Sequence, residues 1–167
     1  ESSVSVLSNC YLLGNLASVV GGGCLKGTLY NCLISGNGAA YGGGTYNSIL
    51  YDCVVSSNLA VQGGGAFFGT LNRCSLSGNR ANINAGTFWF NEAGASANCI
   101  LYDCIVRNNE SGTYGGGSIG GALFNCVLSG NTAADSGGGA FDGALFNCTL
   151  YGNLASTSCG GANGGSL

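Results

Sequence analysis

The chain has 167 residues, enough for one continuous hydrophobic core, and contains 33 Gly, 10 Cys and no Pro, Met or His. The absence of His removes the commonest general base and metal ligand at neutral pH. Four Lys and Arg against seven Asp and Glu give a formal charge of −3, which excludes a cationic surface for nucleic acid. Glycine and asparagine interrupt every apolar run, so no membrane span is expected.

The absence of Met indicates a chain processed from a precursor or a piece of a longer protein. Ten Cys favour an extracellular or cell-surface location, where thiols are exposed to oxidising conditions. We therefore expect an exported protein.

A repeat is visible when the chain is aligned on seven Cys residues, each with Leu three residues before it, an aliphatic residue two after it and Asn five after it. The Cys column is Cys10, Cys32, Cys53, Cys74, Cys104, Cys126 and Cys148. The Leu column is Leu7, Leu29, Leu50, Leu71, Leu101, Leu123 and Leu145. The aliphatic column is Leu12, Ile34, Val55, Leu76, Val106, Leu128 and Leu150. The Asn column is Asn15, Asn37, Asn58, Asn79, Asn109, Asn131 and Asn153.

Glycine runs follow the Asn column at residues 21–23, 42–44, 63–65, 115–117 and 137–139, with a shorter run at 160–161. A period of 21 or 22 residues is too short for two packed helices, and this much glycine disfavours helices. Short apolar alternations bounded by Asn and Gly indicate strands and turns. One repeat cannot bury its own apolar side, so successive repeats must stack about 4.8 Å apart.

The repeat therefore predicts an all-β protein: a right-handed parallel β-helix that forms a single domain over residues 1–167, with about seven coils and one longer coil. Leu, Cys and the aliphatic residue fill the interior, and a bend separates Leu from Cys. We expect the Asn column at a further bend, in the left-handed conformation, with side-chain amides hydrogen-bonded from coil to coil. The glycine runs supply positive φ and close backbone approach.

The words "LSGNTAADSGGGAF" and "LYGNLAS…GGA" resemble the FxxN and GGA[ILV] repeats of polymorphic outer membrane proteins and related bacterial β-helix proteins. The match covers nearly the whole chain, with Leu, Ile or Val in place of the usual Phe. The resemblance implies a right-handed β-helix, export, and adhesion or display at a cell surface. It implies no catalytic residue and no cofactor.

The cysteines of the Cys column are expected to be small buried apolar residues. A metal site is disfavoured because no CxxC motif or His accompanies them. Cys24, Cys99 and Cys159 lie outside the column, and pairing with a column member, such as Cys24 with a neighbour of Cys10, stays open.

Asp52, Arg73 and Asp103 each precede a column Cys, which places acid, base and acid on successive coils. Two carboxylates about 9.5 Å apart would suit an inverting glycosidase. Arg73 between them keeps both carboxylates ionised, which disables a general acid. We expect a structural column of charges and no enzyme.

The fourth coil is nine residues longer than the one before it, with 30 residues against 21 between its column Cys residues. Its glycine run is reduced to residues 84–86, and Phe88 joins a bulky column with Phe67 and Ile119. We expect a loop insertion around 88–98, because insertions in solenoids project from one face. Its candidate binding residues are Trp89, Phe90, Asn91 and Glu92, with the aromatic ring stacking on a sugar or partner. A loop that merely covers the coil is the alternative.

Apolar residues recur directly after the Cys column, where alternation points them outward: Tyr11, Leu33, Val54, Ile105 and Val127. Soluble monomers seldom expose such a stripe. No capping helix is visible at either end, and Leu167 falls in the Leu column. The leading hypothesis is a structural protein that associates with itself head to tail, as a homo-oligomer or filament.

The alternative is an adhesin-like module that binds a glycan or host surface through the Trp89 loop or a solenoid face. A third hypothesis is ice binding through Ser35, Ser56, Ser77 and Ser129, although Leu13, Arg107 and Tyr151 interrupt that column.

Overall fold

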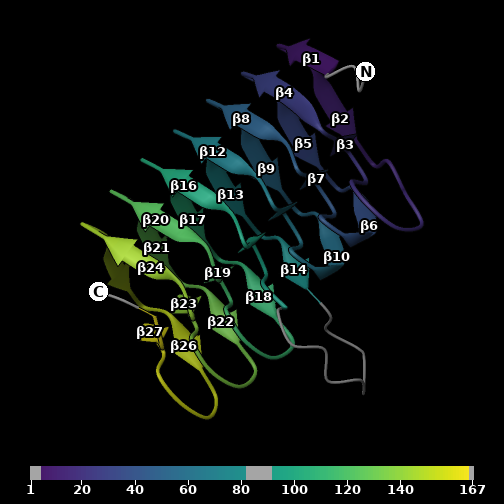
Figure 1. Ribbon diagram of the computed structural model, residues 1–167. Coiled ribbons are helices and arrows are strands. Elements are labelled where there is room, and N and C mark those ends of the chain that lie inside the picture. The colour runs from purple at the N-terminus through teal and green to yellow at the C-terminus, as the bar shows by residue number, and fades with distance from the viewer. Residues whose placement is uncertain (1–4, 82–91, 166–167) are drawn as a thin grey trace.

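The computed structural model describes residues 5–81 and 92–165, which wind into a parallel β-solenoid of seven turns, here called rungs (Figure 1). The parallel β-helix predicted from the repeat is confirmed. Each rung has four sides, and the strands of successive rungs form four parallel sheets, A to D. The described residues contain no helix with the length and hydropathy of a membrane span.

Sheets A and B flank the Cys column and contain one strand from every rung. Sheet A consists of β1 (Ser5–Ser8), β4 (Gly27–Tyr30), β8 (Ile49–Tyr51), β12 (Thr70–Asn72), β16 (Ile100–Tyr102), β20 (Ala122–Phe124) and β24 (Ala144–Phe146). Sheet B consists of β2 (Tyr11–Leu13), β5 (Leu33–Ser35), β9 (Val54–Ser56), β13 (Ser75–Ser77), β17 (Ile105–Arg107), β21 (Val127–Ser129) and β25 (Thr149–Tyr151).

Sheets C and D complete each rung. Sheet C consists of β6 (Gly38–Tyr41), β10 (Leu59–Gln62), β14 (Arg80–Ala81), β18 (Glu110–Ser111), β22 (Thr132–Ala133) and β26 (Leu154–Ala155). Sheet D consists of β3 (Cys24–Leu25), β7 (Thr45–Tyr46), β11 (Ala66–Phe67), β15 (Ser96–Ala97), β19 (Ser118–Ile119), β23 (Ala140–Phe141) and β27 (Ala162–Asn163). The first rung joins sheet C through two isolated bridges, Leu16 to Gly38 and Val20 to Tyr41.

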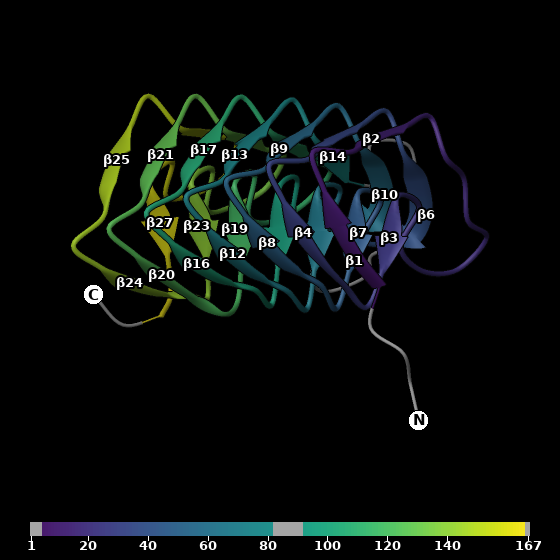
Figure 2. The same ribbon diagram turned by 90° about the horizontal axis from the view of Figure 1, so that it is seen from above.

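Like residues lie on like residues from rung to rung. Figure 2 shows the strands of successive rungs side by side along the solenoid. Leu29 pairs with Leu50, and Ile34 with Val55. The Leu and aliphatic columns are fully buried in the middle rungs, and the column cysteines there are at most 2% exposed. The Leu, Cys and aliphatic columns therefore form the core, as predicted.

Within residues 5–81 and 92–165, each corner between two sheets is turned by a residue with positive φ. The corner from A to B uses Asn9, Asn31, Asp52, Arg73, Asp103, Asn125 and Asn147, so the predicted bend between Leu and Cys is confirmed. The corner from B to C uses Gly14, Gly36, Ser57, Gly78, Asn108, Gly130 and Gly152. The corner from C to D uses Gly21, Gly42, Gly63, Gly115, Gly137 and Cys159. The corner from D to A uses Lys26, Asn47, Phe68, Asn98, Gly120, Asp142 and Gly164.

The Asn column corrects one prediction and confirms another. Positive φ belongs to the residue before each column Asn and not to the Asn itself. The column side chains point inward, and their amides form the predicted ladder. Asn58 Nδ2 donates to Asn79 Oδ1 at 3.0 Å and to the carbonyl oxygen of Ile34 at 3.0 Å. Asn is required here because its amide donates and accepts along the axis.

The glycine runs act as predicted. Gly42 has φ of +62°, which a residue with a side chain rarely adopts. A Cβ on Gly43 would collide with the carbonyl oxygens of Leu59 and Gly64. The third glycine of the run, Gly44, packs against the amide of Asn58.

The structure corrects the C-terminal part of the insertion predicted around 88–98. The backbone of Gly64 and Gly65 bonds to Ala93, Gly94 and Ala95, so residues 93–95 take the place of the glycine run in the fourth rung. Ala97, and not Phe88, pairs with Phe67 and Ile119. Residues 92–98 therefore belong to the coil, and Phe88 lies outside the described residues.

Candidate functional site

The apolar column on sheet B points outward, as predicted. Tyr11, Leu33, Val54, Ser75, Ile105, Val127 and Thr149 lie in register. Tyr11, Val54 and Ile105 are exposed, whereas Leu33 and Val127 are half-buried. Ser75 and Thr149 interrupt the stripe, so it is not continuous. Leu167 lies outside the described residues.

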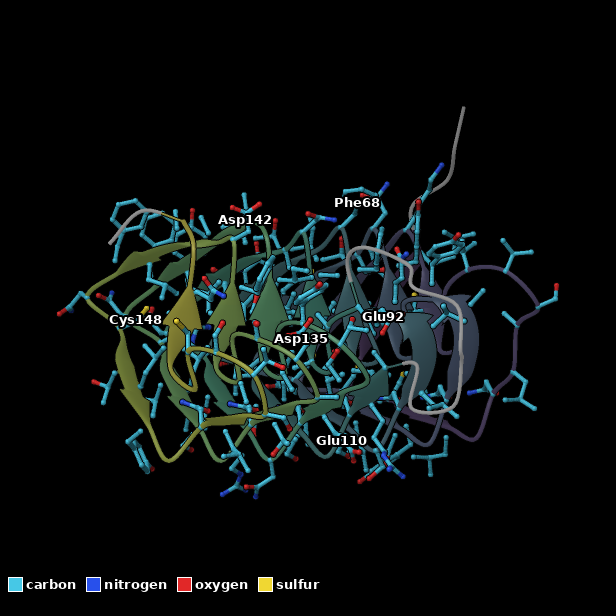
Figure 3. The ribbon with its side chains drawn as sticks, turned by 90° about the horizontal axis from the view of Figure 1, so that it is seen from below. Phe68, Glu92, Glu110, Asp135, Asp142 and Cys148 are labelled. Carbon is cyan, nitrogen blue, oxygen red and sulfur yellow. The ribbon has the colours of Figure 1, made fainter. Side chains whose placement is uncertain are left out.

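Of the four candidate binding residues in the long coil, Trp89, Phe90 and Asn91 lie outside the described residues, and their role stays a prediction. Glu92 was expected on an exposed loop, but it is fully buried. Its Oε2 accepts a hydrogen bond from Thr113 Oγ1 at 2.9 Å, and its carbonyl oxygen accepts one from Ser111 Oγ at 2.8 Å. Glu92 is therefore a structural residue that ties the fourth rung to the fifth (Figure 3).

The charged column at the corner from A to B consists of an ion pair followed by an amide contact. Arg73 donates to Asp52 through Nε at 2.8 Å and Nη2 at 2.7 Å. The hydrogen bonds from Arg73 hold the pKa of Asp52 below its ordinary value of 3.8. Asp103 instead accepts from Asn125 Nδ2 at 3.2 Å. An ionised Asp52 cannot serve as a general acid at neutral pH, which is consistent with the predicted structural role.

All ten cysteines have free thiols, so the disulfides left open for Cys24, Cys99 and Cys159 are not formed. Cys24 pairs with Thr45 in sheet D, and Cys99 follows the corner residue Asn98. Burial raises the pKa of Cys99 to about 12. Cys159 is exposed and turns the corner from C to D. The extracellular location expected from the number of cysteines stays a prediction.

The column thiols also satisfy backbone groups, a role that the repeat pattern did not indicate. The backbone N–H of Cys32 donates to Cys53 Sγ at 3.4 Å, and Cys53 Sγ donates to the carbonyl oxygen of Tyr51 at 3.2 Å. Hydrogen bonding from Cys74, followed by burial, raises the pKa of Cys53. Within the described ranges no group of three or more Cys, Asp or Glu side chains is arranged to hold a metal ion.

The outer face of sheet A carries a column in which five of seven residues are aromatic, each exposed or half-buried, and which was not predicted from the sequence. The column is Ser8, Tyr30, Tyr51, Asn72, Tyr102, Phe124 and Phe146. The rings of Tyr30 and Tyr51 are stacked with centroids 5.0 Å apart, and those of Phe124 and Phe146 with centroids 4.7 Å apart. The signal was an aromatic residue two positions before most column cysteines.

A depression of about 380 Å³ lies at the corner from D to A and was also missed. It is lined by Tyr46, Asn47, Phe68, Gly69, Thr70, Asn98 and Ile100. Phe68 is 50% exposed and lies along the edge of the solenoid that also carries Asp142 (Figure 3). Its ring meets Phe67 at a centroid distance of 4.5 Å and Tyr46 at 6.2 Å, both nearly perpendicular. This corner combines aromatic rings with amide and hydroxyl groups in one recess.

The architecture defines the class of protein as a four-sided parallel β-solenoid. No family model matches the chain, and no curated protein or solved structure was found to be similar to it. The resemblance to the repeats of polymorphic outer membrane proteins therefore stays a prediction.

Proposed function

We propose that this chain is a non-enzymatic structural protein that associates head to tail with further copies of itself along the solenoid axis. The observation that carries this proposal is the complementarity of the two end rungs. Each rung uses the same groups to bind the next one, so the last rung of one copy fits the first rung of another.

The hydrogen-bonding groups of the end rungs match in polarity. Along the Asn ladder, the backbone N–H and Nδ2 of one Asn donate to Oδ1 of the Asn in the next rung, as Asn15 does to Asn37 at 2.9 and 3.0 Å. No described residue accepts from the backbone N–H of Asn153 or donates to Oδ1 of Asn15. Stacking Asn15 of a second copy on Asn153 would continue the ladder, and Cys10 on Cys148 would continue the thiol column.

Apolar groups at the end rungs support the same contact. Leu7 and Cys10 in the first rung and Cys148 and Leu150 in the last are only partly buried, whereas their equivalents in the middle rungs are almost fully buried. Covering these side chains is favourable at about 25 cal/mol per Å² of apolar area. A heterologous contact that does not close on itself generates an open filament.

Light scattering and electron microscopy of the 167-residue chain at rising concentration test this proposal. We expect the mean mass to grow with concentration and rods to lengthen along one axis. Leu150→Arg places a charge on the apolar end of the last rung and should abolish growth. Tyr151→Arg, on the outer face of the same strand, is the matched control and should still assemble. A chain that stays monomeric at all concentrations contradicts the proposal.

A second candidate function is a surface-binding module that uses a solenoid face. The depression at Phe68 favours it, because ligand sites are recesses lined by aromatic groups with a few polar groups. If the module instead binds through the Trp89 loop, Trp89→Ala should abolish binding to the glycan or host surface and leave assembly unchanged.

A further inference from the structure

Phe68 occupies a corner position that the fold fills with other residue types. In the six other rungs the equivalent residue is Lys26, Asn47, Asn98, Gly120, Asp142 or Gly164. Phe68 has φ of +52°, where a bulky side chain is a conformational outlier. Its half-exposed ring is not part of the interior core. Backbone geometry does not account for Phe at this position, and packing on Phe67 and Tyr46 leaves half of the Phe68 side chain exposed. Strained residues of this kind cluster at ligand sites.

Polar side chains beside Phe68 have no partner within the described part of the chain. Asn47 lies one rung before Phe68, Asn98 one rung after it, and Thr70 on the adjoining strand β12. None of these three side chains forms a hydrogen bond with another described residue. At the corner from A to B, by contrast, Asn147 donates to Asn125 at 2.8 Å. The Phe68 ring separates the two amides by two strand spacings, about 9.6 Å, so they cannot pair with each other.

The lining of the depression specifies a neutral ligand that is both apolar and rich in hydroxyl groups. The seven lining residues include no charged side chain, so an ionic ligand has no counter-ion there. The C–H groups of a sugar ring carry partial positive charge and pack on the negative face of an aromatic ring. Asn and Thr side chains both donate and accept, which matches sugar hydroxyls. An aromatic side chain could contact Phe68 but would leave the amides dehydrated and unpaired.

We infer that this recess, the Phe68 site, binds one pyranose ring of a neutral saccharide. The ring packs on Phe68, and its hydroxyls bond to Asn47 and Asn98 on either side and to Thr70. The inference rests on the second candidate function and is independent of head-to-tail association.

The test is a titration of the ¹⁵N-labelled 167-residue chain with neutral hexasaccharides of glucose, N-acetylglucosamine, mannose and galactose. We expect at least one to bind in the millimolar range or tighter and to shift the side-chain amide signals of Asn47 and Asn98. Phe68→Asn should weaken binding at least about tenfold and raise the thermal unfolding midpoint, since Asn is favoured at positive φ. A higher midpoint shows that lost binding is not lost folding.

Phe146→Asn is the matched control, because Phe146 is also a half-exposed Phe but lies on sheet A away from the recess. The affinity of this variant for the saccharide should equal that of the unsubstituted chain. The inference is overturned if none of the hexasaccharides binds, or if N-acetylphenylalaninamide alone shifts the Asn47 and Asn98 signals. Saccharide binding that Phe68→Asn leaves unchanged also overturns the Phe68 site, but the second candidate function then stands with its site elsewhere.

Discussion

At the scale of single residues, the Asn column holds neighbouring rungs together from inside. Asn79 accepts from the backbone N–H of Asn58 at 3.1 Å and from Asn58 Nδ2 at 3.0 Å. It donates to the carbonyl oxygen of Val55 at 2.9 Å and to Asn109 Oδ1 at 3.0 Å. One side chain therefore bonds to buried polar groups in the rung before its own and in the rung after it.

Asn79→Ala should lower the free energy of unfolding by at least about 3 kcal/mol. Several buried groups lose their partner, at about 1–3 kcal/mol each. Urea denaturation followed by circular dichroism measures the change. Ser75→Ala, on the outer face of the same rung, is the control and should change stability by less than about 0.5 kcal/mol. Equal effects of the two substitutions would contradict the role assigned to the ladder.

Arg73 controls the protonation of Asp52. In Arg73→Gln the pKa of Asp52 should rise towards its ordinary value of 3.8, because the hydrogen bonds that lower it are lost. A carboxyl group whose pKa is lower in the folded than in the unfolded state stabilises the fold at pH values above its unfolded pKa. This stabilisation is lost as the pH falls through the folded pKa. The two proteins should therefore converge in stability at acid pH, and their difference should be small because both side chains are exposed. An NMR titration of the Asp52 carboxyl measures the shift, with Arg80→Gln, which breaks the separate pair with Glu110, as control.

The inward columns could be predicted from the sequence because Leu, Cys and the aliphatic residue recur at fixed spacing. The conformation of the column Asn could not. Asn favours both the left-handed region and stacked amides, and the sequence alone does not separate these two roles. The structure does, because Gly36 supplies the positive φ and leaves Asn37 to point inward. The Phe68 site was missed because it joins residues from three rungs.

At the scale of elements, the thiol column is a buried strip between sheets A and B. Its middle members are buried, whereas Cys10 and Cys148 at its ends are partly exposed. Outside the column, Cys99 is buried and Cys159 is exposed. The reactive species is the thiolate, which burial disfavours. Within the column, the thiols of the end rungs should therefore react faster than those of the middle rungs.

Iodoacetamide labelling followed by mass spectrometry should modify Cys159 first and Cys10 and Cys148 more slowly. Cys99, with its pKa raised to about 12, should react only on unfolding. Labelling in urea is the control and should make all ten cysteines equivalent. Modification of Cys53 or Cys104 in the native protein as fast as that of Cys10 would contradict the buried strip, and fast modification of Cys99 would contradict the burial of that thiol.

The placement of the insertion shows what the element pattern can and cannot reveal. Two small-residue stretches compete for the glycine position, residues 84–86 and residues 93–95. Spacing to the next Cys separates them, because Gly65 lies nine residues before Cys74 and Ala95 nine before Cys104. Composition favoured the wrong stretch, since Ala95 takes a place that is Gly in the other rungs.

At the scale of the whole molecule, association along the axis links stability to concentration. If copies stack end to end, the thermal unfolding midpoint should rise with protein concentration, because assembly stabilises only the folded chain. Differential scanning calorimetry over a range of concentrations measures this dependence. Leu150→Arg should remove the dependence, whereas Tyr151→Arg should retain it. A midpoint independent of concentration in the unsubstituted chain would count against stacking.

The in-register repeat also makes length adjustable without change of cross-section. Every rung offers its neighbours the same amide, thiol and backbone groups, so removing one complete unit of 21 residues, such as 39–59, brings equivalent columns back into contact. Deleting ten residues instead would bring strands into register with corners. Tandem duplication or loss of whole units is therefore the form of genetic change that this architecture tolerates, and the length of the rod can vary in steps of about 4.8 Å.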